Sequence, residues 1–186
     1  MIALRKRNEL LEWVKIFIAA LLISLIVRIF LFTPVVVEGE SMNPTLKNNE
    51  RLIVSKVSSI DRFDIIVFHG KENKDFVKRV IGLPGDKIEY RNDVLYINDQ
   101  PYEEEYLEQA KKELKRQYGD ETLLTENFTL EELLGHKTVP KNTLFVMGDN
   151  RQKSLDSRII GFIPMDQVIG EAKLIYWPPG EFKLIR

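Results

Sequence analysis

The sequence predicts a mainly β protein, an antiparallel β-barrel or sandwich with one N-terminal transmembrane helix and a small helical insertion. Three observations lead to this prediction. A long apolar run lies near the N-terminus, many short segments rich in Val and Ile follow it, and one acidic stretch has helical spacing. Short strands without interleaved helices favour antiparallel pairing. A chain of 186 residues has room for one anchor and one compact domain with its own core.

The apolar run extends from Trp13 to Phe32 and is interrupted only by Lys15, Ser24 and Arg28. About twenty residues with a rise of ~1.5 Å each span ~30 Å, the thickness of the hydrocarbon core of a bilayer. Arg28 lies close enough to the end of the run for its head group to reach the interface. The run therefore predicts a helix that crosses the membrane.

Two other interpretations of the run are less favourable. A cleaved secretory signal would end in small residues, whereas residues 33–37 read TPVVV and offer no Ala-x-Ala site. A buried helix of a soluble core would carry a polar face, which this run lacks. We expect residues 1–33 to be a basic cytoplasmic N-terminus and a single uncleaved anchor in the lipid bilayer of the cell membrane. Residues 34–186 then form an extracytoplasmic β-rich domain.

Several short segments after the anchor are predicted to be strands. They are rich in Val and Ile and are separated by turn signals such as Leu83-Pro84-Gly85-Asp86. The segments are Val35–Val37, Leu52–Val57, Ile65–Phe68, Phe76–Ile81, Lys87–Tyr90, Val94–Ile97, Leu144–Met147 and Val168–Trp177.

Residues 103–137 differ in kind from the rest of the domain. An apolar stripe at helical spacing runs through their first half, formed by Leu107, Ala110, Leu114 and Tyr118. Thr129 and Glu132 have the spacing of a capping box, which would begin a second short helix. We expect the stretch to be a solvated helical insertion on the surface, in preference to a docking surface for a partner.

The composition argues against several classes of function. A net charge of -1 is untypical of a nucleic-acid-binding protein, which would carry a strong basic excess. The absence of cysteine excludes disulfides, thiolate metal sites and a cysteine nucleophile. The two histidines, His69 and His136, form no metal-binding pattern and have no triad context. Neither a metal-dependent hydrolase nor a Ser-His-Asp hydrolase is predicted.

The remaining nucleophiles are hydroxyl groups, with a lysine or a carboxylate as the general base. Three segments stand out together: Gly39–Leu46 (GESMNPTL), Phe76–Asp86 (FVKRVIGLPGD) and Met147–Arg158 (MGDNRQKSLDSR). In this order, behind an N-terminal anchor, they closely resemble the conserved boxes of bacterial type I signal peptidases, and of their Gram-positive branch. The resemblance implies a membrane-bound serine endopeptidase that removes signal peptides from exported preproteins by a Ser-Lys dyad, with no metal and no cofactor.

The residues around Lys78 agree with a lysine base. If Phe76–Ile81 is a strand, alternation places Phe76, Lys78 and Val80 on one face. An ammonium group among apolar side chains loses hydration, so its pKa falls. A free lysine near pKa ~10.4 is protonated at pH 7, whereas one near ~7–8 could accept a proton from a serine hydroxyl.

The resemblance implies a role for each residue of the dyad and its neighbours. Ser41 would attack the scissile carbonyl, and Lys78 would accept its proton and return one to the leaving amine. Ser154 would hydrogen-bond Lys78 and orient it. The Ser41 amide would donate to the oxyanion. Some relatives have a serine where Gly39 stands, so here either a backbone N–H or a water would complete the oxyanion hole, or oxyanion stabilisation would be weaker.

The resemblance also implies two structural ion pairs. Asp149 and Asp156 would pair with arginines, which we expect to be Arg79 and Arg158.

The apolar runs 35–37 and 65–67 would either line the substrate groove or pack in the β core.

Two alternatives differ from this interpretation in class. A self-cleaving Ser-Lys protease similar to the SOS-repressor proteases would be soluble and carry a DNA-binding module, which the anchor and the lack of a basic domain disfavour. A catalytically silent, membrane-tethered assembly or binding homologue would be expected to lack the serine or the lysine. Both Ser41 and Lys78 are present.

Overall fold

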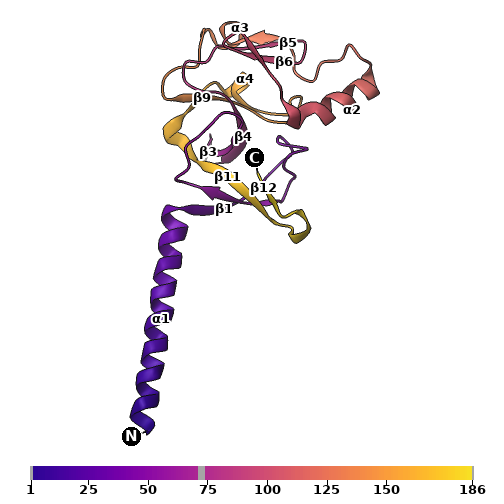
Figure 1. The fold of residues 1–186 in the computed structure, drawn as a ribbon. Coiled ribbons are helices and arrows are strands. Elements are labelled where there is room, and N and C mark those ends of the chain that lie inside the picture. Colours follow the sequence, from indigo (N-terminus) through magenta and orange to yellow (C-terminus); the bar gives the residue numbers. More distant parts are fainter. Residues whose placement is uncertain (1, 71–73, 186) are drawn as a thin grey trace.

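The structure is a computed structural model that describes residues 2–70 and 74–185. Its longest element is helix α1 (Ile2–Phe30), which stands away from a β-rich body as a single rod (Figure 1). The part of α1 from Glu9 to Phe30 has a mean hydropathy of 2.4 and is not buried inside the protein. Its 22 residues would span ~33 Å, which is enough to cross a bilayer.

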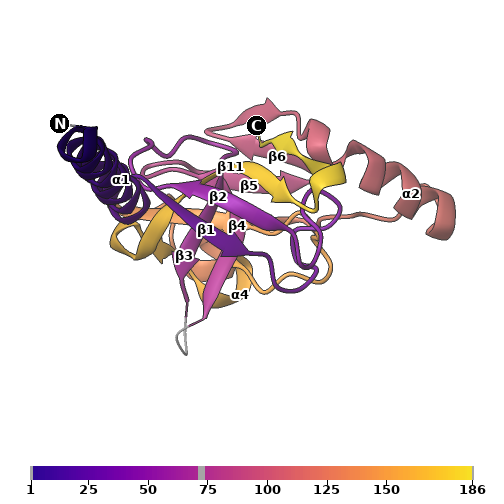
Figure 2. The same ribbon diagram turned by 90° about the horizontal axis from the view of Figure 1, so that it is seen from below.

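The helix ends at Phe30, earlier than the predicted end at Phe32, because Phe32 begins strand β1. Carbonyl groups at a helix end lack partners within the helix. Here Lys56 donates hydrogen bonds to two such carbonyl groups. Its amide donates to Leu31 O at 2.9 Å, and its ammonium donates to Ile29 O at 3.0 Å. These bonds fix the end of α1 to the edge of the body, on the side opposite α2 (Figure 2).

The body contains two antiparallel sheets. The larger sheet has the order β1-β2-β11-β3-β4-β9-β10, with β12 paired to β11. Its strands are β1 (Phe32–Val36), β2 (Arg51–Ser55), β3 (Ile65–His69), β4 (Asp75–Gly82), β9 (Thr143–Met147), β10 (Ile163–Pro164), β11 (Val168–Trp177) and β12 (Lys183–Leu184).

The smaller sheet has the order β7-β6-β5-β8 and lies at the end of the body far from α1 (Figure 1). Its strands are β5 (Ile88–Arg91), β6 (Val94–Ile97), β7 (Gln100–Tyr102) and β8 (Phe128–Thr129). The short α-helices are α2 (Glu108–Tyr118), α3 (Leu130–Leu134) and α4 (Ser157–Ile160), with 3-10 turns at Glu105–Leu107, Met165–Gln167 and Pro179–Glu181.

The predicted fold class is therefore confirmed: the protein is mainly β, antiparallel, with an apolar N-terminal helix. Each predicted strand overlaps an observed one. Strands β7, β8, β10 and β12 were not predicted, because two or three residues are too short to show an alternating pattern.

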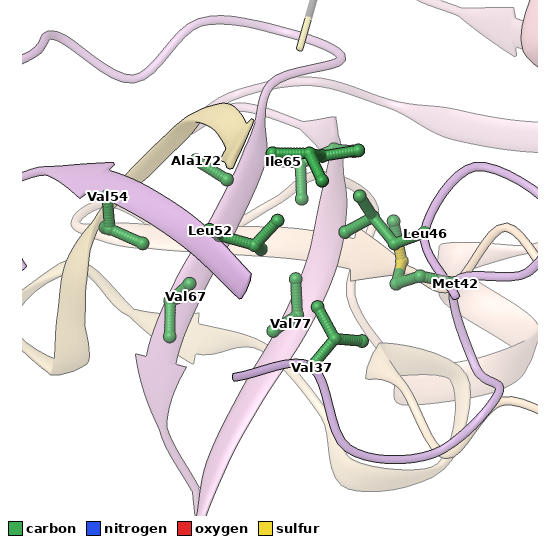
Figure 3. Close-up of a cluster of buried hydrophobic side chains, with 10 residues drawn as sticks. Val37, Met42, Leu46, Leu52, Val54, Ile65, Val67, Val77 and Ala172 are labelled. Carbon is green, nitrogen blue, oxygen red and sulfur yellow. The ribbon is translucent and has the colours of Figure 1, made fainter. Parts of the chain in front are cut away.

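The hydrophobic core anchors the segment that carries the predicted nucleophile. One cluster gathers Val37, Met42 and Leu46, on either side of Ser41, against Val77 of β4 (Figure 3). Met42 and Leu46 are almost completely buried. Since closely packed interiors resist displacement, the backbone around Ser41 is held against β4.

Residues 103–137 are only in part the solvated surface insertion that was predicted. Helix α2 has no buried residue and projects from the body (Figure 1). In contrast, four residues on either side of α2 are buried: Glu104, Leu107, Thr125 and Phe128. The pairing of β8 with β5 brings the second part of this stretch against the body. The predicted capping box is present and begins α3.

Candidate active site

Ser41 lies in a turn that follows β1 and is held from two sides. The buried Met42 fixes it to the core, as described above. Asn150, from the loop after β9, donates its amide to Ser41 O at 3.0 Å and its side-chain Nδ2 to Glu40 O at 3.1 Å. The position of the hydroxyl is therefore set by backbone contacts from a loop more than a hundred residues away in the chain.

The structure brings Lys78 and Ser41 together. Lys78 is in β4, is 2% exposed, and places its Nζ 2.6 Å from Ser41 Oγ. The same ammonium donates to Val77 O at 3.1 Å and lies 5.6 Å from the centre of the Phe76 ring. Lys78 thus shares a face of the strand with Phe76, as the alternation predicted.

Burial changes the acidity of this lysine. Loss of hydration lowers the pKa of Lys78 from 10.5 to about 8, although the carboxylates of Asp156 and Asp149 act in the opposite direction. At pH 7 a group with that pKa is neutral in about one molecule in ten. A neutral amine in contact with a hydroxyl can act as a general base.

The expected hydrogen bond from Ser154 to Lys78 is not made in the structure. Ser154 Oγ is buried and makes no well-formed hydrogen bond among the described residues, although it acts on the Asp156 carboxylate and helps to lower its pKa. It lies instead against Gly148, where an added methyl group would overlap both the Ser154 side chain and Ser41 O. Gly148 therefore lets the loop after β9 approach the turn that carries Ser41.

The first expected ion pair is buried beside the dyad. Arg79 donates Nε and Nη2 to the two carboxylate oxygens of Asp149 at 2.9 and 2.6 Å, and its Nη1 to Phe63 O at 2.8 Å. Burial lowers the pKa of Arg79, but the bond to Asp149 outweighs this and raises it. A two-pronged bond of this kind fixes orientation as well as distance.

The second pair joins Asp156 and Arg158. Arg158 Nε and Nη2 contact the Asp156 carboxylate at 2.9 and 2.8 Å, and the Gly148 amide donates to it at 3.0 Å. Burial raises the pKa of Asp156, but the contacts with Arg158 and Gly148 outweigh it and lower the pKa. The carboxylate thus ties the two ends of the loop after β9 together.

Gly39 adopts a φ of +88°, which is accessible to glycine at little cost. Its amide donates to Asn48 Oδ1 at 2.9 Å, so this N–H is already occupied. No described residue accepts a hydrogen bond from the Ser41 amide. Of these two amides, that of Ser41 is the one left available to an oxyanion.

A groove of about 630 Å³ ends at Ser41 and Lys78. One wall is the stretch from Pro34 to Met42 and the other is the start of β4, from Lys74 to Lys78. The apolar run 35–37 lines the groove, whereas the run 65–67 packs in the core.

Both walls of the groove present free strand edges. Val37 bonds to Glu50 and Asn49 on the β2 side, so by alternation Val36 and Glu38 direct their backbone groups away from β2. On β4, pairing with β9 begins only at Arg79, which leaves residues 75–78 unpaired on that side. An extended peptide could pair with both edges.

Comparison with known proteins agrees with this geometry. Residues 10–177 match the family described as signal peptidase, peptidase S26. The chain belongs to the signal peptidase family. It is 45% identical over 181 residues to signal peptidase I of Bacillus caldolyticus, covering 95% of this chain and 94% of that one. It is 42% identical over 185 residues to signal peptidase IB of Staphylococcus aureus, with the same coverage of both chains.

A solved signal peptidase has the same fold. The crystal structure of a signal peptidase I from Enterococcus faecalis V583 matches with a TM-score of 0.57 at 42% identity, covering 62% of this chain and 97% of that chain. The predicted family is thus confirmed, and the chain is a serine endopeptidase of the signal peptidase I type. Nothing favours the catalytically silent homologue. An apolar N-terminal helix agrees with a membrane anchor for this signal peptidase.

Sequence reasoning left three residues of this signal peptidase without a role. Gly148, Asn150 and Arg151 all lie in the Met147–Arg158 motif, but only the structure shows that Gly148 and Asn150 contact the Ser41 turn. The available signal was their position in the sequence: Gly148 directly precedes the assigned carboxylate Asp149, and Asn150 and Arg151 directly follow it. Within the described ranges, no cluster of three or more His, Asp or Glu side chains could hold a metal ion.

Proposed function

We propose that Ser41 and Lys78 are the nucleophile and the general base with which this signal peptidase cleaves signal peptides from exported preproteins. The observation that carries the proposal is the 2.6 Å contact between Lys78 Nζ and Ser41 Oγ, with the amine buried and its pKa lowered to about 8. An exposed lysine would stay protonated and could not act as the base.

The reaction follows from this contact. Ser41 Oγ attacks the scissile carbonyl carbon while its proton passes to Lys78 Nζ. The resulting ammonium then gives that proton to the leaving amine, which frees the mature protein and leaves an ester on Ser41. Lys78, neutral again, takes a proton from a water that hydrolyses the ester and regenerates the hydroxyl. The Ser41 amide is the proposed oxyanion donor.

The substrate would bind as an extended strand in the groove. Both walls end at the dyad, so a peptide paired with the free edges of β1 and β4 would bring one carbonyl to Ser41. Its side chains would alternate between the protein interior and solvent. Val35, Val37 and Val77 face the inner side of the groove, so inward-facing substrate residues would meet apolar surface.

The membrane geometry supports the same substrate. We propose that α1 crosses the membrane once, with the basic N-terminus in the cytoplasm and residues 34–186 outside. The chain between Phe30 and Ser41 can span at most ~40 Å, so the dyad would stay close to the membrane. A preprotein held in the bilayer by its own apolar segment is confined near the same plane, which raises the effective concentration of its cleavage site.

Mutation tests the assignment directly. Ser41→Ala and Lys78→Ala should each abolish cleavage of a purified preprotein in detergent, whereas His69→Ala and His136→Ala should not. Full activity of Lys78→Ala would contradict the proposed dyad. The remaining site residues, Asp149 and Asp156 with their arginines, are proposed to be scaffold without direct chemistry.

The absence of cysteine makes the topology testable as well. Tyr118→Cys places a single thiol at an exposed position on α2. In intact cells freed of their wall, a membrane-impermeant maleimide should label it. Labelling only after lysis would contradict the proposed orientation.

A further inference from the structure

A buried cluster of charged and hydroxyl groups lies behind the dyad and has no part in the mechanism above. Glu104, which follows β7, accepts hydrogen bonds on Oε1 from Arg151 Nη2 at 2.5 Å, Tyr90 OH at 2.8 Å and Tyr106 OH at 2.6 Å. Arg151 also donates to Tyr90 OH and to Thr125 Oγ1, at 2.8 and 3.1 Å. Glu104 therefore connects the smaller sheet to the loop after β9.

The cluster is ionised in spite of its burial. Arg151 is 2% exposed and Glu104 is 5% exposed. Burial raises the pKa of Glu104, but the charge and hydrogen bond of Arg151 outweigh it and hold the pKa below its ordinary value. Burial likewise lowers the pKa of Arg151, and its partners raise it far above the ordinary range. A buried ion pair often contributes little net stability, because the cost of removing both charges from water offsets their attraction. A role other than stabilisation therefore has to be considered for this pair.

One path from the cluster leads to the nucleophile. Arg151 Nε donates to Gly148 O at 3.1 Å. Gly148 in turn lies directly against Ser41 O, and Asn150 of the same loop hydrogen-bonds Ser41 and Glu40. A shift of Arg151 would move the loop that holds the Ser41 turn.

A second path leads to the base. The Arg79 guanidinium lies 3.9 Å from the centre of the Tyr106 ring, whose hydroxyl is bonded to Glu104. Arg79 is the residue after Lys78 in β4 and also holds Asp149. The same acidic group thus supports, through different neighbours, both halves of the dyad.

We propose that Glu104 is a positioning residue of the reaction, which fixes Arg151 and Tyr106 and through them the Ser41 turn and β4. The inference rests on the proposed roles of Ser41 and Lys78. Reactive groups must be held within a fraction of an ångström, and a displacement of ~1 Å can reduce a rate about a hundredfold. Asp149 and Asp156 of the loop after β9 act on the Lys78 charge through space, so the loop lies near the lysine, and we expect its loosening to admit water to the ammonium.

The test must separate positioning from folding. Removing Glu104 alone would leave the Arg151 charge buried and unpaired, which can unfold the domain. The double variant Glu104→Met/Arg151→Met removes both charges and fills the space with apolar side chains, an exchange that buried ion pairs often tolerate. Glu121→Gln, an exposed change in the same segment, is the matched control.

Cleavage of a preprotein-derived peptide, the pH profile and urea unfolding are measured for each variant in detergent. We expect the double variant to fold and its kcat to fall about tenfold or more, with KM within about twofold, because misplacement acts on the reacting atoms. The midpoint of its pH profile should rise by about one unit as Lys78 regains water. Glu121→Gln should match the parent.

A folded double variant with the parent's kcat and pH midpoint would overturn the inference. If the double variant does not fold, Tyr106→Phe decides, because it keeps the ring under Arg79 and removes only the hydroxyl, which donates to Glu104 Oε1 at 2.6 Å and accepts from Arg151 Nη2 at 3.2 Å. We expect its kcat to fall about two- to fivefold, with stability lowered by no more than the loss of these two hydrogen bonds. An unchanged kcat would also overturn the inference. Activity in Ser41→Ala would instead contradict the dyad itself.

Discussion

Lys78 Nζ lies 2.6 Å from Ser41 Oγ, in a position where the lysine is almost wholly buried and, among the residues that the structure describes, no acidic side chain forms an ion pair with it. The carboxylates of Asp149 and Asp156 act on it only through space. Both are engaged by arginines, which limits how far they can stabilise the ammonium. This arrangement keeps a fraction of the lysine neutral at pH 7 beside the hydroxyl that it is proposed to deprotonate.

The first prediction concerns pH. Only neutral Lys78 can accept the Ser41 proton, so kcat/KM should increase with pH and reach half its plateau near pH 8, where the lysine titrates. A peptide substrate without side chains that titrate between pH 6 and about 10 isolates the enzyme's own group. A profile that is flat across this range, or that falls with pH, would contradict a lysine base.

The second prediction concerns stability. The pKa of Lys78 is about 8 in the folded state and 10.5 unfolded, so between these values the unfolded state binds more protons and stability rises with pH. The penalty for burying the ammonium is thus fully present below pH 8. Lys78→Met should stabilise the domain at pH 7 by about 3 kcal/mol, with the gain shrinking towards pH 10.5.

Urea unfolding at pH 7 and at about pH 10 checks this, with Lys112→Met as the control. Lys112 is exposed and, in the described part of the chain, pairs only with Glu108, so its replacement should leave the free energy of unfolding nearly unchanged. If Lys78→Met were as stable as the parent, or less stable, this would contradict a pKa of Lys78 that burial lowers in the folded state.

The contact between Ser41 and Lys78 could be predicted because the residues that make it lie in recognisable motifs. Alternation in one strand was enough to place Lys78 beside Phe76 on a covered face. The short strands β7 and β8 could not be predicted, since they exist only by pairing with β6 and β5. Strand pairing between distant segments leaves little trace in so few residues.

Glu104 and Ser154 show two further limits. Glu104 lies in an acidic stretch that reads as solvated, and its partner Arg151 is 47 residues away, so nothing local marks it as buried. Ser154 does lie in a motif, but a motif predicts only that a residue lies near the site and not which hydrogen bonds its side chain makes. Its hydroxyl comes close to Gly148 and does not reach Lys78.

The third prediction follows from that hydroxyl. Ser154 Oγ is buried and makes no well-formed hydrogen bond among the described residues, although it acts on the Asp156 carboxylate and helps to lower its pKa, so Ser154→Ala should lower stability in urea unfolding by less than about 1 kcal/mol. Its kcat then reports separately on the orienting role implied by the family: a fall would indicate a contact to Lys78 made only with substrate bound. A loss of stability above about 1 kcal/mol would show instead that the hydroxyl is hydrogen-bonded in the resting enzyme.

The fourth prediction concerns the glycine between the loop and the nucleophile. A methyl group at position 148 would overlap Ser41 O and the Ser154 side chain, and the backbone oxygen cannot move freely because the buried Met42 and Leu46 hold its turn against the core. Gly148→Ala should therefore push the Ser41 turn away from Lys78. We expect kcat to fall about a hundredfold, with the overpacking lowering stability by about 1–3 kcal/mol.

Two further variants show that the loss comes from this contact. Gly180→Ala, where an added methyl group meets open space, should leave kcat and stability unchanged. In Gly148→Ala/Ser154→Ala the overlap with the serine side chain is reduced but that with Ser41 O remains, so stability should recover more than kcat. If Gly148→Ala kept the parent's kcat, or if the second change restored kcat in full, then the close approach of Gly148 to Ser41 would not be what positions the nucleophile.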